Sequence, residues 1–121
     1  VGSANEFDGR IIRIDGERCE ITTALGTLIG VQGGETLSTG QEVAVIIRPE
    51  NCRLTSEPTP TSVACILKDS MFLGSHVQCV LTANNQEFSA VLQGAAPPTA
   101  KSLFVTFDPD QTLVFPKGHT G

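Results

Sequence analysis

The stretch Val43-Ala44-Val45-Ile46-Ile47-Arg48-Pro49-Glu50 occurs twice in this chain of 121 residues, in two related forms. The second form, Leu103-Phe104-Val105-Thr106-Phe107-Asp108-Pro109-Asp110, repeats the apolar alternation, the proline and the acid. The two align without a gap, because the offset is constant at 60 residues (103 − 43, 105 − 45, 109 − 49). Each form predicts a strand that proline ends, since proline has no amide hydrogen for the next ladder bond. The chain is therefore predicted to contain two related β units in tandem.

The composition favours a small all-β protein. Hydrophobic residues make up 40% of the chain and charged residues 17%, which is typical of a globular protein. Twelve glycines and seven prolines separate short apolar runs, as in a barrel or sandwich. Both faces of the strand at 43–47 are apolar, which predicts a strand inside its sheet.

Turn signals organise the rest of the chain. Asp15-Gly16 and Asn84-Asn85 each lie between alternating apolar runs and predict β-hairpins. A further short strand is expected at 28–31, among glycines that serve as turns and bends. The Pro, Thr and Ser residues of 55–62 predict a linker between a first unit at 1–54 and a second at 63–121. The sequence leaves open whether the units, or two chains, exchange strands.

Charge and hydropathy narrow the function classes. The formal net charge is −5, the pI is about 4.8, and the eight Lys and Arg residues are dispersed. Trp and Tyr are absent, so we expect no nucleic-acid partner. No run approaches the ~20 apolar residues of a membrane span, and no signal peptide is recognisable. The chain starts with Val1, and we expect it to be cut from a longer polypeptide.

The residues that usually carry catalysis or bind metals are sparse. The four cysteines lie at or beside strand positions without a Cys-x-x-Cys pair, so buried reduced thiols are expected: Cys19, Cys52, Cys65 and Cys79. His76 and Cys79 offer two ligands, too few for a tetrahedral metal site. His119 is the other histidine, and Asp108 and Asp110 flank a proline as solvated turn acids. We therefore expect no catalytic residue and no metal.

Several motifs together resemble one family. Gly40-x-x-Val43-x-Val45-x-Ile47-Arg48-Pro49-Glu50, Leu73-Gly74, Phe107-x-Pro109 and Leu113-x-Phe115-Pro116-x-Gly118 resemble the C-terminal regulatory region of ATP-binding subunits of bacterial ABC importers. That region is the TOBE (transport-associated OB) domain. The opening Gly2-x-x-Asn5-x-Phe7-x-Gly9 is similar to its entry from the ATPase domain. The motif residues singled out are Gly9, Arg48, Pro49, Glu50 and Gly74.

The resemblance implies tandem OB-like small β-barrel units without catalytic activity. The ATPase domain would lie upstream and bind ATP and Mg²⁺ in the parent subunit; its phosphate-binding loop and signature motif are absent here. The implied partners are the same domain of a second subunit as a homodimer, the membrane subunits indirectly, and a small-molecule or protein regulator. The implied location is cytoplasmic, peripheral to the inner membrane. Apolar residues are expected on outward strand positions, Ile11, Ile46 and Phe104 among them, and either the other unit of the chain or a second chain would cover them. The transported substrate stays open.

A second resemblance concerns oxyanions. Ser3-Ala4-Asn5-x-Phe7-x-Gly9, followed by the strand ending at Arg48, is similar to small molybdate-binding domains, which open with Ser-Ala-Arg-Asn. This implies an alternative function as an oxyanion sensor, with Ser3 and Asn5 as donors and Arg48 as the cation. The Arg of the opening motif is missing here. Arg48 has a competing explanation, an ion pair with Glu50 or another carboxylate at the strand end.

Overall fold

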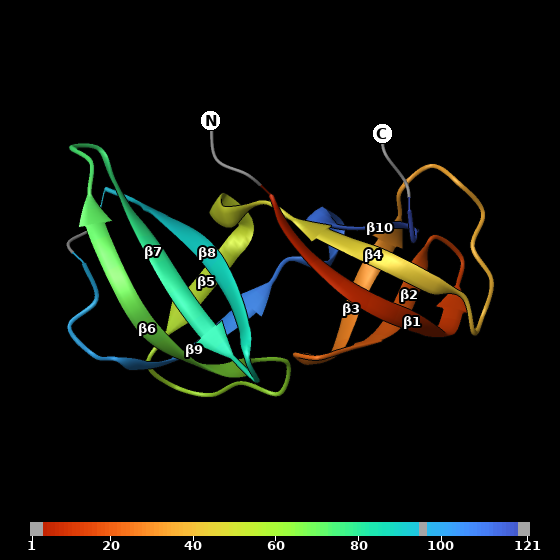
Figure 1. Cartoon of the computed structure of the whole chain (residues 1–121), viewed down its shortest axis with the longest axis horizontal. Coiled ribbons are helices and arrows are strands. Elements are labelled where there is room, and N and C mark those ends of the chain that lie inside the picture. The colour runs from red at the N-terminus through yellow and green to blue at the C-terminus, as the bar shows by residue number, and fades with distance from the viewer. Residues whose placement is uncertain (1–3, 95–96, 119–121) are drawn as a thin grey trace. The chain divides into compact units, whose positions relative to one another are not determined.

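The structure, a computed structural model, describes residues 4–94 and 97–118, and these form ten β-strands and two 3-10 helices (Figure 1). The strands are β1 (Asn5–Asp15), β2 (Arg18–Thr23), β3 (Gly26–Gln32), β4 (Glu42–Ile47), β5 (Cys52–Thr55), β6 (Val63–Phe72), β7 (His76–Ala83), β8 (Gln86–Gln93), β9 (Ser102–Phe107) and β10 (Thr112–Pro116). The short helices are η1 (Pro49–Asn51) and η2 (Pro109–Gln111). Neither has the length and hydropathy that crossing a bilayer requires. The all-β prediction is confirmed.

The first unit is a closed barrel with the strand order β1-β2-β3-β10-β4. It is built from Ala4–Ile47 and from the chain after Phe107. β4 pairs antiparallel with both β1 and β10, so the prediction of an interior strand is confirmed. β10 runs parallel to β3 and completes the ring. The alternating apolar residues of these strands are buried, among them Phe7, Ile11, Cys19, Ile21, Leu28, Val43, Val45, Ile47 and Val114.

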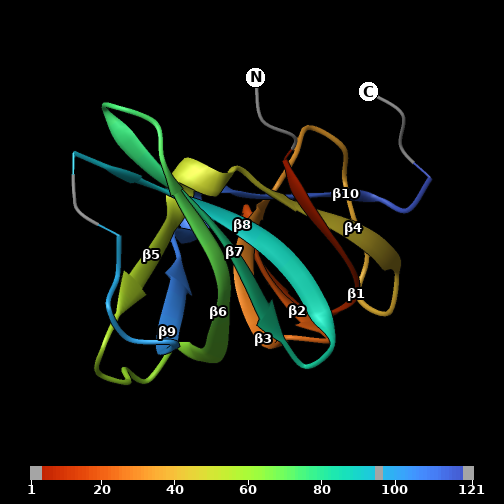
Figure 2. The ribbon, with the colours of Figure 1, turned by 60° about the vertical axis from the view of Figure 1, so that its left-hand side comes forward.

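The second unit, Arg48–Phe107, is an open five-stranded sheet with the order β5-β9-β6-β7-β8 (Figure 2). Its buried residues include Cys65, Leu67, Val77, Cys79, Leu81, Phe88, Ala90, Leu103 and Val105. The β7–β8 hairpin turns at Asn84 and Asn85, as predicted. Both have positive φ, 48° and 65°. A two-residue hairpin turn of this type needs that conformation, and asparagine tolerates it.

The internal repeat extends over both units. The series β1-β2-β3-β4-η1-β5 recurs as β6-β7-β8-β9-η2-β10. The long first strand of each series has a bulge, between Ile11 and Arg13 in β1 and between Leu67 and Asp69 in β6. A bulge bends a strand and increases its twist, which helps a sheet to curve. The repeat therefore includes the curvature of the sheet as well as the order of the strands.

The two repeats exchange their last strands, and this corrects the predicted domain boundaries. β5 of the first repeat pairs with β9, and β10 of the second repeat pairs with β4 and β3. The units are therefore not residues 1–54 and 63–121. The stretch at 55–62 connects β5 to β6 inside one unit instead of joining two units.

One glycine allows the first unit to close. A Cβ at Gly30 in β3 would lie 2.6 Å from the backbone oxygen of Thr112 in β10 and 3.0 Å from the Val114 side chain. β10 can pair with β3 only because that Cβ is missing. The matching position 60 residues later, in β8, is the fully buried Ala90. β5 is not a neighbour of β8 in the second sheet, which is open.

Other sequence predictions have mixed outcomes. The hairpin at Asp15-Gly16 forms between β1 and β2, with Gly16 at φ +64°. The strand expected at 28–31 is the centre of β3. The prediction that Ile11 faces outward is wrong: it is 1% exposed, because it continues the buried alternation of Asn5 and Phe7 ahead of the bulge.

Candidate functional site

The Arg48-Pro49-Glu50 motif forms the turn at η1. Pro49 is buried in the first turn of the helix, where its missing N–H costs no hydrogen bond. The amide of Asn51 donates to the Arg48 carbonyl (2.9 Å), and the amide of Cys52 donates to the Pro49 carbonyl. The Cys52 thiol also lies 3.8 Å from the Arg48 carbonyl. The proline therefore has a structural role, and the two charged side chains are exposed.

The second copy of the motif, at η2, is more strongly bonded. The Asp108 carboxylate accepts from the Asp110 amide (2.9 Å), as a helix-capping side chain does. The buried Thr112 hydroxyl donates to the Asp108 carbonyl (2.8 Å). Asp110 itself forms a 2.5 Å ion pair with Arg18 on β2. These acids cap and brace a turn, and neither faces a histidine in the described contacts.

Arg48 and Glu50 differ from this second copy. Among residues 4–94 and 97–118, Arg48 forms no ion pair, and the predicted pairing with Glu50 is not observed. An exposed guanidinium without a carboxylate within reach keeps its donors available for an external anion. Arg48 is thus the motif residue best suited to bind an external anion.

The residues of the oxyanion hypothesis are only partly described. Asn5 is 9% exposed and lies opposite Ile47 in the β1–β4 ladder. Because Arg48 directly follows Ile47, the ladder ends where Arg48 leaves the strand. Ser3 lies outside the described residues. Asn5 therefore belongs to the barrel, and Arg48 is the first residue of the second unit.

The two motif glycines have conformational and steric explanations. A Cβ at Gly9 would lie 2.4 Å from Cγ2 of Ile21 on the neighbouring strand, so β1 and β2 require glycine there. Gly74 has φ +87° in the β6–β7 turn, where the Leu73 amide donates to the His76 carbonyl (2.8 Å). Residues other than glycine rarely adopt that backbone conformation.

The cysteines are buried thiols, as predicted. Desolvation raises the pKa of Cys65 to about 11 and also raises the pKa values of Cys19 and Cys79. Thiols of this kind stay neutral and are poor nucleophiles. Within the described part of the chain, no three His, Cys, Asp or Glu side chains gather as a metal site. His76 lies beside the Ser75 hydroxyl (3.2 Å), and His119 is outside the described residues.

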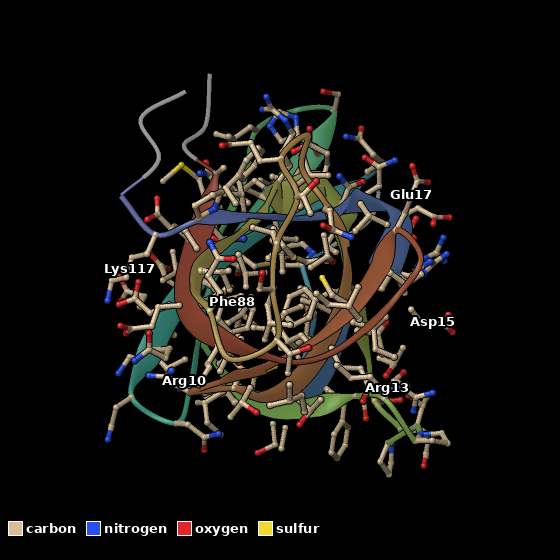
Figure 3. The ribbon with its side chains drawn as sticks, turned by 90° about the vertical axis from the view of Figure 1, so that its right-hand side faces the viewer. Arg10, Arg13, Asp15, Glu17, Phe88 and Lys117 are labelled. Carbon is tan, nitrogen blue, oxygen red and sulfur yellow. The ribbon has the colours of Figure 1, made fainter. Side chains whose placement is uncertain are left out.

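The outer wall of the barrel is charged (Figure 3). Arg10 lies near Glu42 (4.0 Å) and Arg13 near Glu20 (3.6 Å). Lys117 lies near Asp8, also at 3.6 Å. A shallow hollow of about 200 Å³ is lined by Arg13, Arg18, Asp15 and Glu20 among others, and both arginines already have acidic partners. Exposed pairs like these add little stability, so this wall is a solvated surface.

Comparison with known proteins identifies the family. The profile of the TOBE domain matches residues 45–115, which is more than half of the chain. The chain belongs to the TOBE domain family. The match includes the Arg48-Pro49-Glu50 turn and Gly74, two of the places at which the sequence resembled that family. No curated protein matches the chain.

The TOBE chain also has similar solved structures. One is the cytoplasmic molybdate-binding protein ModG, crystallised with molybdate bound. The TM-score is 0.74, and the alignment covers 94% of this chain and 96% of ModG. The sequences are 13% identical. The likeness therefore establishes a shared arrangement of OB-like β units and confirms the predicted fold class.

Proposed function

We propose that this chain is the non-catalytic regulatory domain of the ATP-binding subunit of an ABC importer. The observation that carries the proposal is the TOBE profile over residues 45–115, because that domain was the one implied by the Arg48-Pro49-Glu50 and Leu73-Gly74 motifs. The turn geometry supports it, since the motif builds loops and leaves charged side chains at the surface. ATP and Mg²⁺ would bind elsewhere in the parent subunit, in the cytoplasm at the inner membrane.

The proposed partner is the same domain of a second subunit. The tip of the β6–β7 hairpin supports an interaction role, because three consecutive apolar residues are exposed there: Met71 (56%), Phe72 (56%) and Leu73 (44%). Exposed apolar clusters of this kind mark interaction surfaces more often than isolated residues do. A pairing that relies on contacts elsewhere in the subunit would be weak in the isolated domain.

The test is to purify the native polypeptide that carries this chain from its own cells. We expect that polypeptide to hydrolyse Mg-ATP and to co-purify with an integral membrane protein, whereas residues 1–121 alone bind no Mg-ATP in calorimetry. A native polypeptide without ATP hydrolysis would contradict the importer role.

Oxyanion sensing is the second candidate. It is supported by the fold shared with ModG and by the position of Arg48, which lacks an acidic partner among the described residues and follows the strand that pairs with Asn5. Titration calorimetry with molybdate, tungstate and sulfate distinguishes the two candidates. Tight binding of one oxyanion that Arg48→Ala abolishes would favour the sensor function. No binding heat with any of the three oxyanions would favour the regulatory function.

A further inference from the structure

The outer face of the second unit departs from the repeat. In the barrel, Arg10 on β1 lies opposite Thr22 and Glu42 on its two neighbouring strands. In the second unit, the matching register places Ile66 on β6 opposite Thr82 and Ser102. The ion pair of the first unit is thus replaced by an exposed isoleucine (46%) and a hydroxyl.

The next row of the same face changes in the same direction. Asp8 lies opposite Ala44 in the barrel, and Asp8 pairs with Lys117. The matching pair in the second unit is Ala64 opposite Phe104. The acid has become alanine and the alanine has become an aromatic ring. In these two rows the positions that match Arg10, Glu42 and Asp8 are neutral, and the charged residue in the first row is Glu87 on β8, opposite Thr82.

This face is hollowed. A depression of about 440 Å³ is lined by Ile66 and Phe104, by the hydroxyl residues Thr82 and Ser102, and by the turn residues Asn84 and Asn85, among others. The volume is within the range of small-molecule sites, about 300–1,000 Å³. The left-handed conformations at Asn84 and Asn85 fix the turn, so its side chains start from a rigid backbone.

The chemistry of the lining selects the ligand. No Asp, Glu, Lys or Arg is among the described residues that line the depression, and burial keeps the thiol of Cys65, which also lines it, neutral by raising its pKa. An anionic ligand would lose its water without gaining a counter-charge, and the exposed Glu87 opposite Thr82 disfavours an anion further. Amides and hydroxyls both donate and accept hydrogen bonds, which suits ligand hydroxyl groups. The apolar wall at Phe104 and Ile66 suits a ring with C–H faces.

We propose that this depression, which we call the neutral face site, binds an uncharged saccharide of one or two rings. Phe104 packs against the C–H face of the sugar, and Asn84, Asn85, Thr82 and Ser102 bond its hydroxyl groups. The site belongs to the chain itself, and the proposal does not rest on the importer role. Because the depression is open to solvent, binding is expected in the millimolar range.

The test is titration of the isotopically labelled chain with maltose, followed by amide chemical shifts. Maltose should shift the amides of Asn84, Asn85 and Ser102 in a saturable way, and Phe104→Ala should weaken binding at least tenfold. Glucose should compete, whereas glucose 6-phosphate should bind at least tenfold more weakly than glucose.

A second variant restores the charges of the barrel. Ile66→Arg with Ser102→Glu places the Arg10 and Glu42 pair at the matching positions, so the chain should stay folded and lose maltose binding. Ile12→Arg, at an exposed isoleucine of the barrel, is the matched control and should bind normally. The proposal is overturned if tens of millimolar maltose shifts none of these amides, if glucose 6-phosphate binds as well as glucose, or if the restored charges leave binding unchanged. It is also overturned if the same amides shift with protein concentration alone, which would assign the face to a second copy.

Discussion

Replacement of Gly30 by alanine tests the explanation of barrel closure. The new methyl group would lie 2.6 Å from the Thr112 carbonyl oxygen and 3.0 Å from Cγ2 of both Thr112 and Val114. A backbone oxygen cannot rotate away, so β10 must move from β3. Overpacking of this kind costs about 1–3 kcal/mol, and each lost ladder bond adds about 1 kcal/mol. Alanine also lowers the conformational entropy of the unfolded chain, which stabilises the folded state by only about 0.4–1 kcal/mol. With one or two ladder bonds lost, the expected net loss is about 1–5 kcal/mol in the free energy of unfolding.

The assay is urea unfolding followed by far-ultraviolet circular dichroism, since the chain has no Trp or Tyr. Gly16→Ala is the control, because nothing lies within 4 Å of its added Cβ and only its positive φ opposes alanine. It should cost about 1 kcal/mol. Hydrogen exchange should show that Gly30→Ala exposes the Gly33 amide, which donates to Val114 (2.8 Å). A loss below about 0.5 kcal/mol, or a Gly33 amide that stays protected, would refute the steric explanation.

Four further predictions follow from the same contacts. Ala90→Gly gives β8 the glycine that β3 has at Gly30, so amides of β5 and β8 should gain exchange protection, and unchanged protection would show that this methyl group does not keep the sheet open. Thr112→Val removes the bond to the Asp108 carbonyl and should cost about 1 kcal/mol in urea unfolding, whereas a neutral effect would show that the hydroxyl is dispensable. Arg18→Ala should cost less than about 1 kcal/mol, because Arg18 and Asp110 are both largely exposed, and salt should reduce this effect. The unfolded Cys65 thiol ionises near pH 9 while its folded pKa is about 11, so stability should be constant below pH 9 and fall as pH rises to 11; Cys65→Ala should flatten that decline, and an equally steep decline would contradict it.

The sequence predicted the local features of the fold well. The strand at 43–47, its copy at 103–107 and the two hairpin turns each depend on neighbouring residues, through alternation, proline and positive-φ positions. The repeat was visible in the sequence because Pro49 and Pro109 each end a strand at the matching position of its copy. Local chemistry of this kind is readable in one sequence.

Strand exchange could not be predicted in that way. Nothing in β5 or β10 says which of two similar sheets it joins, since both sheets offer similar edges. The pairing is nonlocal: β10 pairs with β4 and β3, and its approach to β3 needs Gly30, which is far from β10 in the sequence. The neutral face site was missed for a related reason. The feature that indicates the site is a difference between the two repeats, because Ile66 stands at the position that matches Arg10. The two positions can be matched only when the strand register around both bulges is known.

The regulatory proposal depends most directly on self-association of the TOBE chain, and sedimentation equilibrium measures it. A weak pairing surface predicts a monomer–dimer equilibrium between about micromolar and millimolar protein, and Phe72→Asp at the exposed β6–β7 tip should shift it toward monomer. Ile12→Asp, an equally drastic change on the barrel, should leave the equilibrium unchanged. A strict monomer at the highest concentration, or a dimer that Phe72→Asp does not weaken, would contradict pairing through this surface.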